Sequence, residues 1–156
     1  QPIVAELLLR RRLDLGNLLL GSGRVDEALE HFRAAVAIND LHALAHYSLG
    51  ATLLRDGQVE EAIRELRRAA ELSDDLWQAR FSLGLALGDL GETEAAIEQF
   101  RITTRMAPRY AMAHATLGMM LKRLGRENEA EQAFQAARRL GLDADRLPED
   151  LLASPP

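Results

Sequence analysis

Hydrophobic and small residues recur along this chain with the period of an α-helix. Between residues 77 and 110, one helical face is formed by residues at i, i+3, i+4 and i+7, namely Arg80, Leu83, Gly84 and Leu87. Gly91 is expected to end this helix, because glycine accepts the left-handed conformation found at helix C-termini. A second helical pattern starts near Ala96 and closes before Pro108, since proline cannot continue a helix. The segment therefore predicts a helical hairpin with a short turn.

The same pattern returns every 34 residues, so the chain reads as a repeat protein. With a leucine-glycine pair at positions 7 and 8 of each repeat, a glycine recurs at position 15, an alanine at 20 and a large apolar residue at 24. These columns hold Gly16, Gly50, Gly84 and Gly118; Gly23, Gly57, Gly91 and Gly125; Ala28, Ala62, Ala96 and Ala130; and Phe32, Leu66, Phe100 and Phe134. We predict that glycine 8 faces alanine 20 across the hairpin and that residue 24 points toward the neighbouring repeat.

The spacing divides the chain into four repeats. We call residues 9–42, 43–76, 77–110 and 111–144 repeats 1 to 4. Residues 1–8 predict an N-terminal extension of the first helix, which reads as continuous from Ile3 to Leu20. Residues 145–156 predict a tail in which Pro148 opens a short capping helix. The expected fold is all-α, a solenoid of four helix-turn-helix hairpins.

These columns resemble the tetratricopeptide repeat family. The family pattern is Trp-x2-Leu-Gly-x2-Tyr, then Ala-x3-Phe, then Pro. The chain supplies the Leu-Gly pairs, the alanine and large apolar columns, and Pro108, but has arginine or histidine in the tryptophan column and leucine in the tyrosine column. The resemblance covers residues 9–144 and implies a right-handed superhelix with a concave groove lined by the first helix of each repeat.

The resemblance also implies which residues line that groove, at positions 2, 5, 9, 12 and 13. Read onto this chain, the candidate partner-binding residues are Arg10, Leu13, Asn17, Leu44, Tyr47, Leu54, Arg55, Gln78, Phe81, Leu85, Met112, Met119, Lys122 and Arg123. Many are large and apolar, and exposed apolar patches usually bind a partner. We call the residues at these five positions of the four repeats the stripe. It carries four cationic side chains and one acid, Asp89, in a chain of net charge −5. The cationic residues are Arg10, Arg55, Lys122 and Arg123. We expect a protein or peptide with apolar anchors and some acidic residues. The alternative is that an end of the chain, or a second copy, covers the stripe.

Little in the sequence points to catalysis, a cofactor or a metal, and we expect none of them. Cysteine is absent, and the glycines are periodic structural residues rather than a phosphate-binding loop. His42 and His46 have a spacing that can hold a metal, but His46 shares its column with His114, which favours packing. The acidic balance argues against nucleic acid. No apolar run reaches the roughly 20 residues that span a bilayer, so membrane insertion is not expected.

Three functional interpretations remain open. The first is a non-enzymatic scaffold that binds a protein segment in its groove. The second is a self-assembling structural module, and the third is a docking or regulatory arm of a larger, catalytic protein, which fits a chain beginning at Gln1. Frequent arginine, alanine and leucine are typical of a GC-rich bacterial genome. We expect a cytoplasmic protein, with an exported mature form left open.

Overall fold

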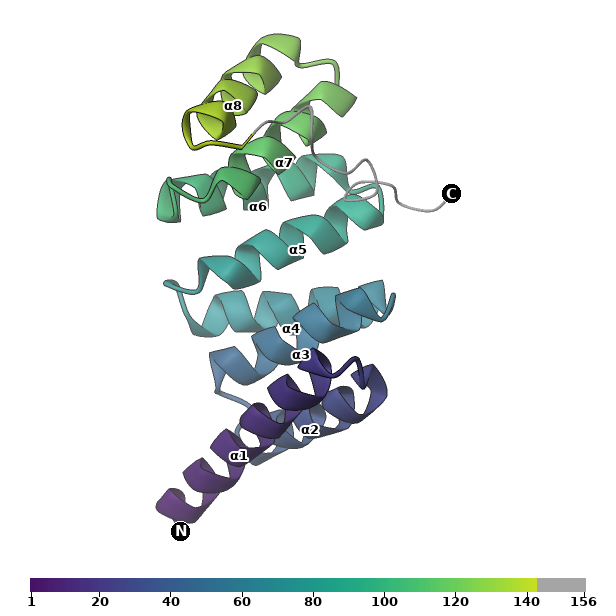
Figure 1. Cartoon of the computed structure of the whole chain (residues 1–156), viewed down its shortest axis with the longest axis vertical. Coiled ribbons are helices and arrows are strands. Elements are labelled where there is room, and N and C mark those ends of the chain that lie inside the picture. The colour runs from purple at the N-terminus through teal and green to yellow at the C-terminus, as the bar shows by residue number, and fades with distance from the viewer. Residues whose placement is uncertain (143–156) are drawn as a thin grey trace. The chain divides into compact units, whose positions relative to one another are not determined.

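The computed structural model describes residues 1–142, and within that range the chain folds into eight α-helices and no strands (Figure 1). The helices are α1 (Pro2–Gly21), α2 (Val25–Ile38), α3 (Ala43–Arg55), α4 (Val59–Leu72), α5 (Trp77–Asp89), α6 (Thr93–Met106), α7 (Ala111–Arg123) and α8 (Glu127–Arg139). The all-α prediction is confirmed, and so is the continuous first helix. The short helix expected after Pro148 lies outside the described residues.

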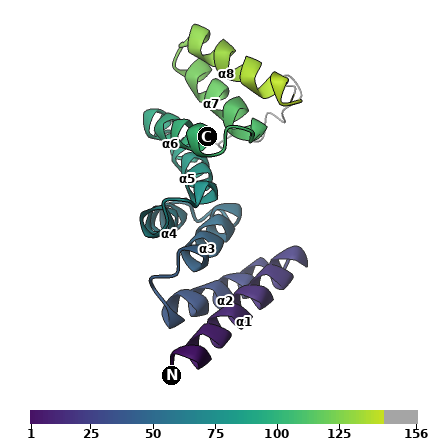
Figure 2. The ribbon, with the colours of Figure 1, turned by 90° about the vertical axis from the view of Figure 1, so that its left-hand side faces the viewer.

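The chain divides into two compact units, Gln1–Ala79 and Arg80–Pro156. In the first unit α1 packs against α2, α3 packs against α4, and α2 contacts α3. In the second unit α7 packs against α8, and α6 contacts α7. The antiparallel pairs α1–α2 and α7–α8 are visible in Figure 2. Each unit is thus built from the helical hairpins that the sequence predicts.

Glycine ends the first helix of every repeat, as the sequence predicts. Gly23, Gly57, Gly91 and Gly125 all have positive φ, between 71° and 80°. In repeat 1 the Gly23 N–H donates to the Leu20 carbonyl, and the Arg24 N–H donates to the Leu19 carbonyl. This pair of bonds is the Schellman motif, and it returns after α3, α5 and α7. The next helix begins directly after this loop. Its first turn carries acidic side chains, such as Asp26 and Glu27 in α2, which the positive end of the helix dipole stabilises.

The closest contact inside each hairpin lies between the glycine at position 8 and the large residue at position 24. A Cβ atom on Gly84 would stand 2.7 Å from Cε1 of Phe100, and one on Gly16 would stand 2.5 Å from the same atom of Phe32. We predicted that glycine 8 faces the alanine at position 20 and that residue 24 points toward the neighbouring repeat, but the atoms nearest to this glycine belong to residue 24. In repeat 3 the alanine lies opposite position 12, since Cβ of Ala96 is 4.0 Å from a Cβ placed on Gly88. Residue 24 therefore packs within its own hairpin.

We predict that Gly84→Ala lowers the free energy of unfolding. The new methyl group has no room beside the Phe100 ring, and overpacking of this kind costs about 1–3 kcal/mol, offset by up to about 1 kcal/mol of helix propensity. Urea denaturation measures the difference.

Gly88→Ala is the matched control in the same helix. Its Cβ would meet Met120 Sδ at 3.6 Å, an ordinary contact, so this variant should be as stable as the parent or more stable. Equal stability of the two variants would contradict the close-approach argument.

Candidate protein interface

In the first unit, the predicted stripe lies on α1, α3 and the start of α5. Arg10, Asn17, Leu44 and Arg55 are exposed, with Leu44 at 47%. Three more stripe residues are half-buried, namely Tyr47, Leu54 and Gln78. Tyr47 packs against the buried cluster of Ala69, Ala70 and Ala79, which holds its ring in place. The stripe therefore combines an anchored aromatic ring with exposed aliphatic and cationic groups.

Leu13 does not belong to this surface. It is 7% exposed and forms a row of buried residues with Leu9 and Gly16, at i, i+4 and i+7 relative to Leu9. This row is the face of α1 that packs on α2. The sequence assigned Leu13 to the groove, and the structure places it in the core.

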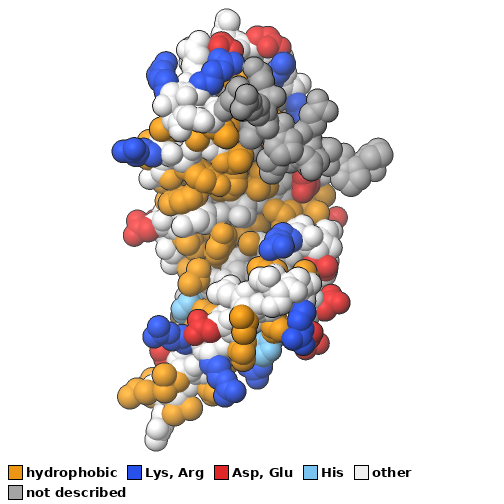
Figure 3. All heavy atoms as spheres, in the orientation of Figure 1, with side chains coloured by type: hydrophobic (Ala, Val, Ile, Leu, Met, Phe, Trp, Pro, Cys, Tyr) orange, Lys and Arg blue, Asp and Glu red, His pale blue; other side chains and the backbone are white. Residues whose placement is uncertain are grey.

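In the second unit, half-buried apolar side chains come from α5 and α7, namely Phe81, Leu85, Met112 and Met119. Phe81 contacts Tyr110 edge to face, with ring centroids 5.1 Å apart, and lies 5.6 Å from Phe100. Lys122 and Arg123, in the last turn of α7, are exposed. Figure 3 shows hydrophobic side chains gathered over α5 and α7. This surface is apolar with a cationic end.

A further apolar surface, which sequence reasoning missed, lies on the first two turns of α1. Ile3 is 74% exposed, Leu7 63%, Val4 50% and Leu8 47%. The pairs Ile3–Leu7 and Val4–Leu8 have i, i+4 spacing, which was the signal available in the sequence. We call these four residues the α1 apolar edge. It is visible at the N-terminal end of the chain in Figure 3.

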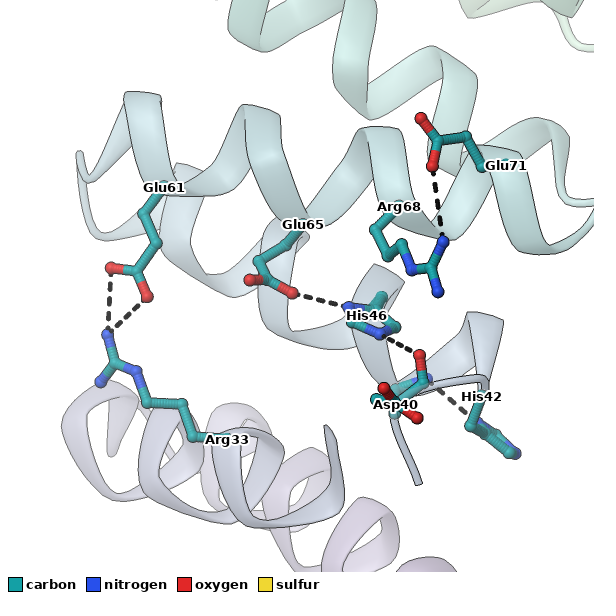
Figure 4. A network of polar contacts seen from close by, with 9 residues as sticks. Arg33, Asp40, His42, His46, Glu61, Glu65, Arg68 and Glu71 are labelled. Carbon is teal, nitrogen blue, oxygen red and sulfur yellow. Dashed lines mark hydrogen bonds and ion pairs between the residues drawn. The ribbon is translucent and has the colours of Figure 1, made fainter. Parts of the chain in front are cut away.

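A polar network joins α2, α3 and α4 (Figure 4). His46 is 6% exposed, and both of its ring nitrogens are engaged. Its Nδ1 lies 2.7 Å from Oε2 of Glu65, and its Nε2 lies 2.9 Å from the Asp40 carbonyl oxygen. His42 caps α3, because its Nδ1 accepts from the Ala45 N–H. The two histidines therefore have separate structural roles. Residues 1–142 contain no group of three or more histidines and acids placed to hold a metal.

Ion pairs at one fixed spacing tie successive second helices together within each unit. Arg33 of α2 pairs with Glu61 of α4 at 3.2 Å, and Arg101 of α6 pairs with Glu129 of α8 at 2.7 Å. Both pairs join position 25 of one repeat to position 19 of the next. All four side chains are substantially exposed, so each pair contributes little stability by itself. Their equivalent positions show that the two pairs of repeats pack in the same register.

Shifted pKa values occur on exposed surfaces. Hydrogen bonds from Arg138 and then Gln135 lower the pKa of Glu131 on α8. A hydrogen bond to Glu27 raises the pKa of Arg24, at the start of α2. Both shifts come from neighbours in the same helical segment, which is typical of a solvated helix face.

Paired helices, small residues at their crossing and glycine-capped turns at a constant spacing define the class of helical repeat proteins. The family model described as tetratricopeptide repeat matches residues 13–76 and 81–145. The chain belongs to the tetratricopeptide repeat family. Membership in this family supports a role as a protein–protein interaction scaffold.

Solved structures of MamA resemble this chain. One crystal structure of MamA is 27% identical, with a TM-score of 0.81 over 85% of this chain and 78% of that one. A second is also 27% identical, with a TM-score of 0.79 over 85% and 72%. MamA 41-end from Desulfovibrio magneticus RS-1 is 24% identical, with a TM-score of 0.79 over 85% and 75%, and shows the shared fold alone. A comparison with curated proteins gives no match.

Among the described residues, no helix combines the length and the apolar character needed to cross a membrane.

We predict that Glu65→Ala lowers the free energy of unfolding by about 1–2 kcal/mol, since it leaves a buried imidazole nitrogen without its partner. Glu129→Ala is the control, because it removes a glutamate from an exposed pair and should change stability by less than about 0.5 kcal/mol. Denaturant titrations of the two variants give the comparison. Equal changes in the free energy of unfolding would mean that the burial of His46 does not make its bond to Glu65 more stabilising than an exposed ion pair.

Proposed function

We propose that this protein is a non-enzymatic scaffold that binds a protein segment along the exposed stripe of its first helices. The observation that carries the proposal is the coexistence of exposed or half-exposed apolar side chains with cationic ones on one helix face of each unit. A large apolar surface that remains accessible usually serves an interaction.

Charge complementarity narrows the class of partner. The stripe carries Arg10 and Arg55 in the first unit and Lys122 and Arg123 in the second, while the whole chain has a net charge of −5. A partner with acidic residues is therefore attracted to the stripe and repelled by much of the remaining surface. Apolar anchors on the partner would contact Leu44 or Met119, and methionine adapts to varied shapes.

The mode of binding follows from the repeat geometry. Parallel helix faces present anchor points at regular intervals, which suits an amphipathic helix or an extended peptide. Each unit offers one such stripe, so the proposal requires only that one unit engage a segment. Membership in the tetratricopeptide repeat family supports a scaffold role.

We expect the charge reversals Arg10→Glu and Arg55→Glu together to weaken partner binding at least about 10-fold, because each removes an attraction and adds a repulsion. Peptides selected from a displayed random library would supply the ligand, and fluorescence anisotropy would give the affinity. The selected peptides should be rich in acidic residues and in Leu, Ile or Phe.

The matched control is Arg64→Glu with Arg67→Glu, two exposed positions on α4 that give the same change in net charge away from the stripe. This control should retain affinity to within about 3-fold at physiological salt. Similar losses in both double variants would show that binding responds to net charge rather than to the stripe.

Self-association is a second candidate function, and the α1 apolar edge favours it. Four large side chains on two helical turns are at least 47% exposed, which is more than single scattered surface residues present. A second copy could bury this edge.

Light scattering over a concentration series measures the mass directly. If the edge mediates self-association, the mass exceeds 17.3 kDa at high concentration and returns to the monomer value in Leu7→Glu with Leu8→Glu. A constant mass of 17.3 kDa in the parent protein excludes this candidate at the concentrations tested and leaves the edge free for another partner.

A further inference from the structure

The second unit contains a pocket of about 270 Å³ between α6, α7 and α8. His114 lies on its α7 side, and Ala133 lies on its α8 side. The Arg101–Glu129 ion pair spans its rim from α6 to α8. We call this the repeat-4 pocket. It involves positions 4, 7 and 11 of the first helix, whereas the proposed stripe uses positions 2, 5, 9, 12 and 13, so it is a separate site.

The corresponding place in repeat 2 is filled by the chain itself. There Arg33 and Glu61 form the same ion pair as Arg101 and Glu129, and His46 stands where repeat 4 has His114. Glu65, which corresponds to Ala133, sends its carboxylate to His46 Nδ1 at 2.7 Å (Figure 4). Repeat 4 therefore has the surroundings of this carboxylate without the carboxylate.

Positions 4 and 23 both carry polar side chains in repeats 1 and 3 as well, and in repeat 1 the two are in contact. In repeat 1 they are Arg12 and His31, whose Nη1 and Nδ1 atoms lie 3.2 Å apart. In repeat 3 they are Arg80 and Gln99, both polar. Repeat 4 alone has an apolar residue at position 23, which leaves the space beside His114 open.

The His114 ring is held in the same way as the His46 ring. Its Nε2 lies 2.8 Å from the Pro108 carbonyl oxygen, just as Nε2 of His46 lies 2.9 Å from the Asp40 carbonyl oxygen. A carbonyl only accepts, so Nε2 carries a proton in both rings. Within residues 1–142, the structure shows no hydrogen bond at Nδ1 of His114. A carboxylate at Nδ1 would make this ring a double donor, which requires the imidazolium form.

We propose that the repeat-4 pocket binds the carboxylate of a glutamate side chain from a partner protein. The bound group takes the place that Glu65 occupies in repeat 2, with His114 Nδ1–H as its donor. The Arg101 guanidinium is paired with Glu129 at the pocket, and this pairing offsets the repulsion between Glu129 and the bound carboxylate. The volume suits one side chain rather than a folded element, which makes the pocket a specificity subsite on a larger interface.

Histidine ring NMR signals test the proposal, with acetyl-Gly-Glu-Gly-amide as the probe and acetyl-Gly-Gln-Gly-amide as its neutral counterpart. The glutamate peptide should shift the His114 signals saturably, with a dissociation constant on the order of 10 mM, because one charge-assisted hydrogen bond carries most of the binding. The His46 signals should not move, since Glu65 already fills that site.

Two variants exchange the properties of the two repeats. Ala133→Glu supplies the carboxylate internally and should weaken the peptide effect on His114 at least about 10-fold. Glu65→Ala opens the corresponding place in repeat 2, so the same peptide should then shift His46. Glu61 and Glu65 already coexist in α4, so Glu129 and the new carboxylate can coexist in α8.

The proposal is overturned if the glutamate peptide does not shift His114, if the glutamine peptide shifts it equally, or if Ala133→Glu leaves the shift unchanged. Glutarate at the same ionic strength separates a protein side chain from a free small carboxylate. Tighter binding of glutarate than of the peptide would overturn the assignment to a partner protein.

Discussion

The contact between the glycine at position 8 and the large side chain at position 24 sets the geometry of every hairpin. Gly16, Gly50, Gly84 and Gly118 each lie so close to residue 24 of the same repeat that a Cβ atom would fall within 3 Å of it. A helix pair can approach this closely only where one side lacks a side chain. Residue 24 then covers the backbone of the first helix, and three of these four large residues are buried while Phe134 of the last repeat is half-buried.

This constraint divides each repeat into positions that must be kept and positions that are free to change. The glycine turns and the residues at 7, 8, 20 and 24 are fixed by packing and backbone conformation, so they recur with little change. Positions on the other faces of the first helix, and position 23 of the second, touch solvent or polar neighbours. They vary between repeats, and position 23 differs in all four, where it holds His31, Glu65, Gln99 and Ala133. Function in such a chain is expected at the variable positions, because the packing shared by all four repeats does not fix which residue stands there.

The fold could be predicted almost entirely from the sequence, because a packing rule that is repeated four times leaves a periodic trace. The helix ends at Gly91 and before Pro108 follow from backbone conformation alone. The partner of the glycine could not be deduced with the same certainty, since positions 20 and 24 lie on one face of the second helix, one turn apart. Either residue satisfies the pattern, and only the structure shows that the larger one lies against the glycine.

The candidate surfaces were harder to predict because they depend on the rotation of each helix about its axis. Position 5 shows this directly: Phe81 is half-exposed at that position in α5, while Leu13 at the same position in α1 is buried. Leu9, at position 1 of the same repeat, is buried on the face of α1 that packs on α2, and Leu13 continues that row into the core. The pocket beside His114 was hidden for a related reason. An alanine in a periodic sequence suggests a closely packed position. Only comparison with Glu65, which fills the same place two repeats earlier, indicates that Ala133 leaves space beside His114. Differences between repeats, once the common pattern is subtracted, are therefore the most direct guide to what a chain of this kind recognises.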